Sequence, residues 1–133
     1  MKENAMKIEH VCINVADIEK EKDFYCQLFD FRPSAKYHNA KTGWENYFLS
    51  SPTGEARLEL LSHEGMALKE KDRTMSGLVH LSFSLDSKEA VDEMTTTIVG
   101  MGLTLLRGPR VTGDGYYESS FLDPEGNMIE LTI

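Results

Sequence analysis

Apolar and polar residues alternate with a period of two along Lys7–Val15 and Gly77–Leu85, which predicts a β-strand in each stretch. Successive side chains of a strand point to opposite faces, so His10 and His80 fall on the more polar face of their strands. Cys12 and Asn14 share that face in the first stretch. The opposite, apolar face carries Val11, Ile13 and Val15 in the first stretch and Val79, Leu81, Phe83 and Leu85 in the second.

Each of these strands is followed by a stretch in which apolar residues recur every three to four positions, as on one face of a helix. The apolar face carries Phe24, Tyr25, Leu28 and Phe29 in the first stretch and Ala90, Val91, Met94 and Ile98 in the second. Asp17 is the predicted N-cap of the first helix, which ends before Arg32 and Pro33. Asp86 or Ser87 caps the second helix, which stops near Gly100 or Gly102.

Short strands follow both helices, and the last two of each set are joined by a turn that contains proline and glycine. The expected strands read YFLS, RLELL, TLLRG, YESSFL and MIELTI, with a shorter run near Lys36. Pro fixes one turn dihedral and Gly accepts a positive φ, so Ser51–Gly54 and Asp123–Gly126 are predicted hairpin turns. The chain therefore contains two copies of one unit, strand, helix and strands, which predicts an α+β fold.

Glu59 and Glu130 occupy the middle of corresponding strands, and each follows the histidine of its copy at nearly the same distance (59 − 10 = 49 and 130 − 80 = 50). Alternation places both carboxylates opposite the apolar residues of their strands. Two imidazoles and two carboxylates suit Zn, Ni, Fe, Co or Mn better than Ca or Mg. A lone His or Glu in a strand is more often solvated, but the duplication favours a shared divalent metal.

The composition narrows the classes of function. With 133 residues, 41% of them hydrophobic, the chain is long enough to bury a core in one domain, residues 1–133. A net charge of −8 argues against nucleic acid or an anionic membrane as a partner. We find no apolar signal segment or membrane span, so a cytoplasmic location is expected. Cys12 and Cys26 are expected to be free, buried thiols.

The repeated pattern resembles a known superfamily. The motifs HVCINVADIEKEKDFYCQLFDF, GLVHLSFSLDS and SSFLDPEGNMIEL are similar to those of the vicinal oxygen chelate superfamily, across about Met6 to Ile133. Its members include glyoxalase I, extradiol dioxygenases, fosfomycin-resistance proteins and bleomycin-binding proteins. The resemblance implies two tandem βαβββ modules, about residues 6–62 and 76–133, whose cupped mixed sheets surround one divalent metal. We expect Zn or Ni there first, and Fe, Co or Mn after them.

In glyoxalase I, the four metal ligands come from the positions matched here by His10, Glu59, His80 and Glu130. The resemblance implies a lactoylglutathione lyase-like enzyme that isomerises a hemithioacetal or another small α-hydroxycarbonyl compound through an enediolate. Glu130 or Glu59 would leave the metal to act as the base. It also implies a homodimer in which the modules pair across chains, although pairing within one chain remains open.

The chain departs from the glyoxalase I pattern at two positions. Asn14 stands where that family commonly has a glutathione-binding Arg, and His63 stands where it has an Asn, which puts glutathione in question as the co-substrate. Arg107 and Arg110 could receive an anionic group, because guanidinium matches carboxylate geometry, although solvated loop charges are the commoner role of such arginines. The candidate substrate-binding residues are Asn14, His63, Arg110 and Tyr117. A non-catalytic binding or resistance protein and an Fe-dependent dioxygenase with three protein ligands are the alternatives.

Overall fold

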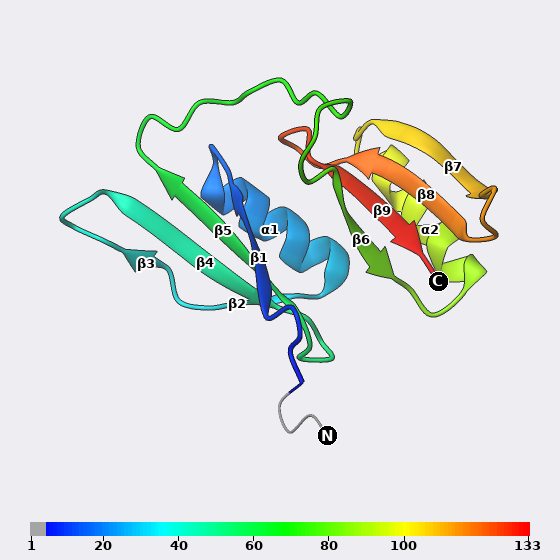
Figure 1. Ribbon diagram of the computed structural model, residues 1–133, viewed down its shortest axis with the longest axis horizontal. Helices are drawn as coiled ribbons and strands as arrows, with labels where there is room; N and C mark the ends of the chain where they lie inside the picture. Colours follow the sequence, from blue (N-terminus) through cyan, green and yellow to red (C-terminus); the bar gives the residue numbers. More distant parts are fainter. Residues whose placement is uncertain (1–4) are drawn as a thin grey trace. The chain divides into compact units, whose positions relative to one another are not determined.

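The computed structural model describes residues 5–133 and divides the chain into two compact units (Figure 1). The division falls between Leu68 and Lys69; the part before it is module one, and the part after it is module two. Each module contains one helix and one mixed sheet, in the order strand, helix, strands. The predicted α+β fold of two tandem modules is therefore confirmed.

Module one contains a five-stranded sheet in the order β1-β5-β4-β2, with β3 also paired to β4. Strands β1 and β5 are parallel, and the other pairs are antiparallel. The elements are β1 (His10–Asn14), α1 (Ile18–Phe29), β2 (Arg32–Pro33), β3 (Tyr37–His38), β4 (Trp44–Ser50) and β5 (Arg57–His63). The strand expected near Lys36 is thus two short pieces on either side of that residue.

Module two contains a four-stranded sheet in the order β6-β9-β8-β7. The first and last strands of the module, β6 and β9, are parallel neighbours, just as β1 and β5 are in module one. The elements are β6 (His80–Ser84), α2 (Lys88–Gly100), β7 (Leu105–Val111), β8 (Tyr117–Leu122) and β9 (Met128–Thr132). No helix within residues 5–133 combines the length and apolar character needed to cross a membrane.

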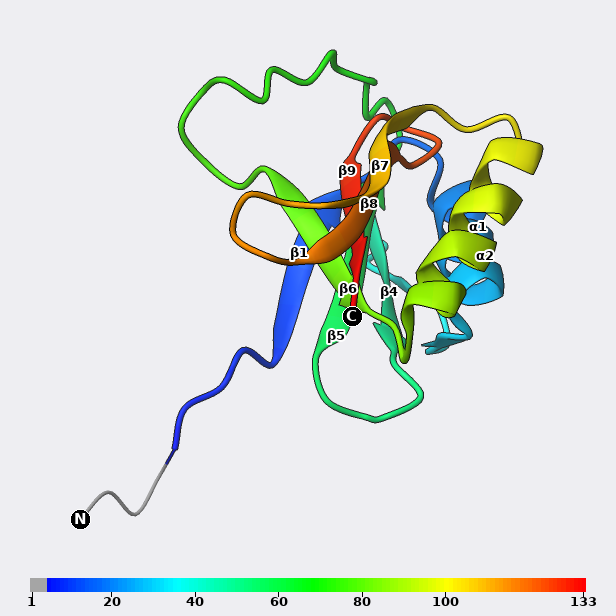
Figure 2. The same ribbon diagram turned by 90° about the vertical axis from the view of Figure 1, so that its right-hand side faces the viewer.

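Each helix covers one face of the sheet in its own module, and Figure 2 shows α2 lying along its sheet. In α1 the predicted aromatic face is buried at Phe24, Tyr25 and Phe29. In α2, Val91 and Ile98 are buried as predicted, but Thr95 lies between them and is buried as well. The Thr95 hydroxyl bonds to Ser119 Oγ at 2.7 Å, which satisfies both polar groups.

The predicted helix caps and turns are observed. Asp17 accepts a hydrogen bond from the Lys20 amide at 3.0 Å, and Ser87, rather than Asp86, accepts one from the Ala90 amide at 3.1 Å. The turn glycines Gly54 and Gly126 adopt φ of +73° and +85°. Each donates its amide to the first residue of its turn at 3.0 Å. These local signals fix the helix starts and the β4–β5 and β8–β9 hairpins.

Strand β7 is longer than expected and irregular. Its register against β8 shifts twice, so that Arg107 pairs with Ser120 and Arg110 pairs with Glu118. Residues three apart normally face opposite sides of a strand, but the extra residue turns both arginines to one face. Gly108 lies in the bulge at φ +82°, where a Cβ would come within 2.4 Å of the Glu118 carbonyl oxygen. Only glycine fits that position.

Candidate metal centre

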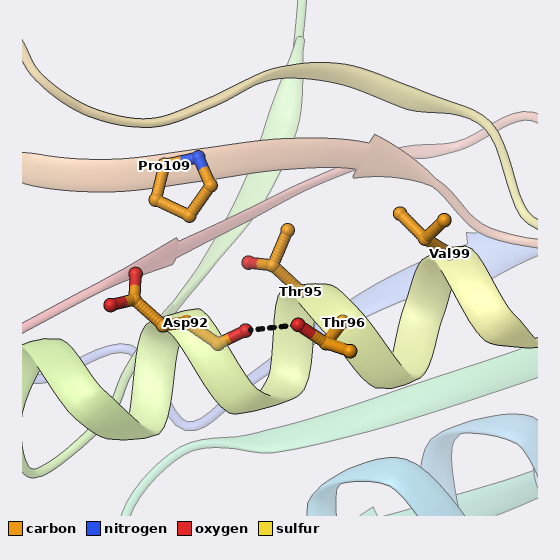
Figure 3. Close-up of a pocket in the computed structure, with 5 residues that line it drawn as sticks. All are labelled: Asp92, Thr95, Thr96, Val99 and Pro109. Atoms are coloured by element: carbon orange, nitrogen blue, oxygen red, sulfur yellow. Dashed lines mark hydrogen bonds between the residues drawn. The ribbon is translucent and has the colours of Figure 1, made fainter.

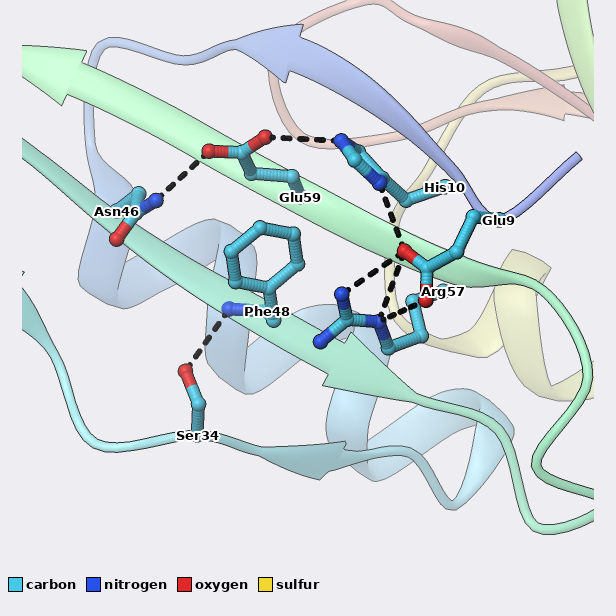
Figure 4. A network of polar contacts seen from close by, with 7 residues as sticks. All are labelled: Glu9, His10, Ser34, Asn46, Phe48, Arg57 and Glu59. Atoms are coloured by element: carbon cyan, nitrogen blue, oxygen red, sulfur yellow. Dashed lines mark hydrogen bonds and ion pairs between the residues drawn. The ribbon is translucent and has the colours of Figure 1, made fainter.

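The polar face of the module one sheet brings His10 and Glu59 together (Figure 4). Glu59 lies opposite Cys12 in the parallel β1–β5 pair, so His10, two residues earlier, shares its face. His10 Nε2 and Glu59 Oε1 are 3.5 Å apart. The Glu59 side chain is only 14% exposed, and that of His10 is 39% exposed.

Module two repeats the arrangement. Glu130 lies opposite Ser82 in the parallel β6–β9 pair, and His80 precedes Ser82 by two residues. His80 Nε2 and Glu130 Oε1 are 3.4 Å apart. The two His–Glu pairs therefore have equivalent positions and nearly equal separations, as expected from the repeated sequence.

The donor geometry of each pair fits a divalent metal. Two donors bound about 2.1 Å from one ion lie about 3.0–3.5 Å apart at octahedral to tetrahedral angles. In module one, Glu9 Oε1 contacts His10 Nδ1 at 2.8 Å, and hydrogen bonds from Arg57 and then His10 lower the pKa of Glu9. An ionised carboxylate only accepts, so Nδ1 donates to Glu9, and in the neutral imidazole this leaves the Nε2 lone pair facing the Glu59 carboxylate. A divalent metal ion between His10 Nε2 and Glu59 Oε1 would bind both atoms.

The second oxygen of Glu59 is held by a neighbouring strand. Asn46 Nδ2, on β4, donates to Glu59 Oε2 at 2.7 Å. Cys12, on β1, also contacts Glu59, and its pKa is raised to about 11, first because neighbouring atoms partly shield the thiol from water and then by the carboxylate charge. The thiol therefore stays protonated at neutral pH. Cys12 was expected to be buried, but alternation places it on the polar face, where the residue is exposed.

In module two a second carboxylate lies beside Glu130. Glu118, on β8, shares a hydrogen bond with Glu130, and its pKa is raised by burial and then by the Glu130 charge, while Arg110 opposes the shift. These side chains line a polar pocket of about 410 Å³. The pocket lining is His80, Ser82, Arg110, Thr112, Asp114, Tyr116, Glu118, Glu130 and Thr132. The candidate substrate-binding residue Arg110 is thus brought together with His80 and Glu130.

Two further predicted residues lie on the polar face of module one. Asn14 follows His10 on β1 with the same parity. His63 lies four residues after Glu59 on β5, and its ring meets the Trp44 ring edge-on at a centroid distance of 4.3 Å. Both residues are therefore on the sheet face that carries His10 and Glu59.

Tyr117, a candidate substrate-binding residue, does not lie with His80 and Glu130. Its hydroxyl donates to Asp92 on α2, and Lys88 Nζ lies 4.7 Å from the centre of its ring. Asp92 also lines a separate groove of about 360 Å³ between α2 and Pro109 (Figure 3). Phe121 must face the helix to be buried, so alternation turns Tyr117 the same way. Tyr116 lines the polar pocket instead.

Asn46 and Glu118, which lie beside Glu59 and Glu130, were not among the predicted site residues. They occupy equivalent positions, two residues before Phe48 and Ser120, which lie directly opposite Glu59 and Glu130. Side chains also alternate between faces along β4 and β8. Applying that alternation to these two strands would have placed Asn46 and Glu118 on the polar faces. Glu9, outside β1, carried no such signal.

Comparisons with known proteins agree with this description. The family model of the Glyoxalase/Bleomycin resistance protein/Dioxygenase superfamily matches residues 7–131. The chain is 28% identical over 132 residues to the uncharacterised protein YqjT of Bacillus subtilis (strain 168), covering 93% of this chain and 96% of that protein.

Solved structures share the fold. A glyoxylase/bleomycin resistance protein/dioxygenase domain from Frankia sp. EAN1pec matches with a TM-score of 0.84 at 20% identity, over 98% of each chain. The trypanothione-dependent glyoxalase I of Leishmania major matches with a TM-score of 0.78 at 18% identity, over 96% of this chain and 86% of the other. At these identities the likeness shows the fold alone.

Proposed function

The chain belongs to the Glyoxalase/Bleomycin resistance protein/Dioxygenase superfamily, and from this premise we propose that it is a metal-dependent, glyoxalase I-like lyase. Its substrate is a hemithioacetal or another small α-hydroxycarbonyl compound. The observation that carries the proposal is the pair of equivalent His–Glu contacts, 3.5 Å in module one and 3.4 Å in module two. Two matched donor pairs on equivalent strands favour a metal-dependent enzyme over a binding protein without a metal.

We propose that His10, Glu59, His80 and Glu130 together hold one divalent ion, Zn or Ni first and Fe, Co or Mn after them. Each module supplies half of the ligands, with the modules paired across a homodimer. When bound, the cation supplies Lewis-acid polarisation of two neighbouring substrate oxygens, which acidifies the adjoining C–H bond. The free thiols Cys12 and Cys26 fit a reducing, cytoplasmic location.

Glu130 is the better candidate for the base, since its carboxylate is the less restrained of the two. Asn46 donates to Glu59 and fixes that side chain as a ligand. Glu130 instead contacts Glu118, and two neighbouring carboxylates repel each other when both are ionised. In this proposal Glu130 takes a proton from one substrate carbon and returns it to the neighbouring carbon.

The module two pocket sets the substrate size. A volume of about 410 Å³ suits a small molecule. Arg110 and Tyr116 offer donors to substrate oxygens or to a carboxylate, and Ser82 and Thr112 offer hydroxyls. In module one, Asn14 and His63 provide an amide and an imidazole where glyoxalase I has other residues. The identity of the thiol co-substrate is therefore to be determined by assaying glutathione and other small thiols.

The test measures metal and turnover in the same samples. Purified protein, stripped with chelator and reloaded with Zn²⁺ or Ni²⁺, is assayed with methylglyoxal and glutathione or other small thiols. We expect about one ion for each set of four ligands, and turnover that requires the ion. His80→Ala should lose both, whereas His38→Ala, which changes an exposed histidine paired with Glu45, should lose neither.

Other outcomes would contradict the proposal in distinct ways. Tight ligand binding without turnover, with no metal retained, would indicate a binding or resistance protein. Consumption of oxygen by the Fe²⁺ form, with activity that survives Glu59→Gln, would indicate a dioxygenase with three protein ligands.

A further inference from the structure

Two residues outside the four donors hold the donor atoms of module one in place. Glu9 Oε1 lies 2.8 Å from His10 Nδ1, and Asn46 Nδ2 lies 2.7 Å from Glu59 Oε2. Each contact occupies the atom of the donor that faces away from its partner (Figure 4). His10 Nε2 and Glu59 Oε1 are left facing each other.

Glu9 is itself held by the guanidinium group of Arg57. Arg57 donates to it from Nε at 3.0 Å and from Nη2 at 2.8 Å. The Arg57 guanidinium also lies 4.2 Å from the centre of the Phe48 ring, and that ring meets the His10 imidazole edge-on at 5.2 Å. Contacts therefore surround His10 on two sides and restrict its ring orientation.

Module two fills the equivalent positions with different chemistry. Glu118 stands where module one has Asn46, and Ser120 stands where it has Phe48. Glu118 is a second carboxylate rather than an amide, and a serine offers no aromatic ring to His80. The amide and aromatic contacts of module one thus have no counterpart at these positions.

We propose that Glu9 and Asn46 are positioning residues that preset His10 and Glu59 for a divalent cation, so that module one is the half that captures the metal. This inference rests on the proposed function, because it assumes that both donors bind the ion. Glu9 fixes the imidazole tautomer that leaves Nε2 free, and Asn46 fixes the carboxylate rotamer. Neither side chain is one of the four proposed ligands.

The experiment compares Zn²⁺ affinity in matched variants by competition with a chromophoric chelator. Glu9→Ala and Asn46→Leu should each weaken Zn²⁺ binding by about 10- to 100-fold, the usual cost of removing a partner of a metal ligand. The controls Glu45→Ala and Asn39→Leu make the same changes elsewhere in module one. Glu45 pairs with the ring of His38, and Asn39 caps a turn before β4.

A second readout separates positioning from a general loss of structure. In the metal-free protein, the ¹⁵N shifts of the His10 imidazole should report a proton on Nδ1. Glu9→Ala should move that proton toward Nε2, whereas Glu45→Ala should leave the His10 signals unchanged. Thermal unfolding checks each variant, and Asn46→Ala replaces Asn46→Leu if the leucine variant does not fold.

Two outcomes would overturn the inference, and they are distinguishable. If wild-type protein binds Zn²⁺ and both variants bind it equally well, the positioning role is wrong while the proposed function stands. If wild-type protein binds no divalent ion, both fail. The inference would be supported if only Glu9→Ala and Asn46→Leu lose Zn²⁺ affinity and if Glu9→Ala shifts the His10 proton from Nδ1 toward Nε2.

Discussion

Modules one and two place the same two donors on the same two strands, yet they surround them differently. In module one an amide, Asn46, lies beside Glu59; in module two a carboxylate, Glu118, lies beside Glu130. The backbone register brings each His and Glu together in both modules. The comparison teaches that the fold sets where the donors lie, while the residues beside them set how firmly each is held.

The helix-to-sheet interfaces differ in the same manner. Tyr25 follows the cap Asp17 by eight residues, and Thr95 follows the cap Ser87 by eight (25 − 17 and 95 − 87). Tyr25 packs with Phe24 and Phe29, whereas Thr95 uses its hydroxyl to bond the sheet. The helix-to-sheet interface of module one is therefore stabilised by packed aromatic rings, whereas that of module two contains a buried hydrogen bond between hydroxyl groups.

The largest expected effect distinguishes the two carboxylates. Glu130→Gln should lower kcat by about 100- to 10,000-fold at saturating metal, because general base catalysis contributes that much. Glu59→Gln should instead act mainly on metal affinity, so that excess Zn²⁺ or Ni²⁺ restores much of its activity. Steady-state kinetics across a metal titration measures both. Equal losses of kcat in the two variants would remove the distinction between the modules.

A large effect on stability is expected in the aromatic interface. Tyr25 is fully buried, and Tyr25→Ala should lower the free energy of unfolding by about 3–5 kcal/mol through the cavity it leaves. Urea unfolding followed by fluorescence measures the change. Tyr37→Ala, at a tyrosine that is 60% exposed, is the control and should cost far less.

A smaller loss is expected at the hydroxyl pair. Thr95→Val removes one partner and leaves the buried Ser119 hydroxyl without it, at a cost of about 1–3 kcal/mol. The double variant Thr95→Val with Ser119→Ala should recover most of that loss, since neither polar group remains. Urea unfolding of the two single variants and the double variant forms a cycle. Strict additivity would show that the hydroxyls do not interact.

The smallest effect concerns pH. The raised pKa of Glu118 means that the folded state holds its proton to higher pH than the unfolded chain does, which stabilises the fold in acid. That stability is lost as pH rises from the ordinary value of 4.5 through the folded pKa. As pH rises from 4 to 7, the free energy of unfolding of Glu118→Gln should therefore increase relative to that of wild type. Thermal unfolding of EDTA-treated proteins tests this; a constant difference would contradict it.

Much of the fold could be predicted from the sequence because its periodicities are local. The period of two put His10 and Glu59 on polar faces, and parallel pairing of the first and last strands then brought them together. The β7 bulges could not be predicted, since the register of adjacent strands depends on the geometry of Gly108. The facing of Tyr117 could not be predicted either, because it is set by the burial of Phe121. How the two modules pair remains a prediction.

The irregular strand β7 has a consequence for solubility at high concentration. It is an edge of the module two sheet, and edges with free backbone groups invite pairing with another chain. Pro109 offers no amide hydrogen, and the two register shifts interrupt the row of donors and acceptors. The bulge that turns Arg107 and Arg110 to one face thus also makes this edge a poor template for aggregation.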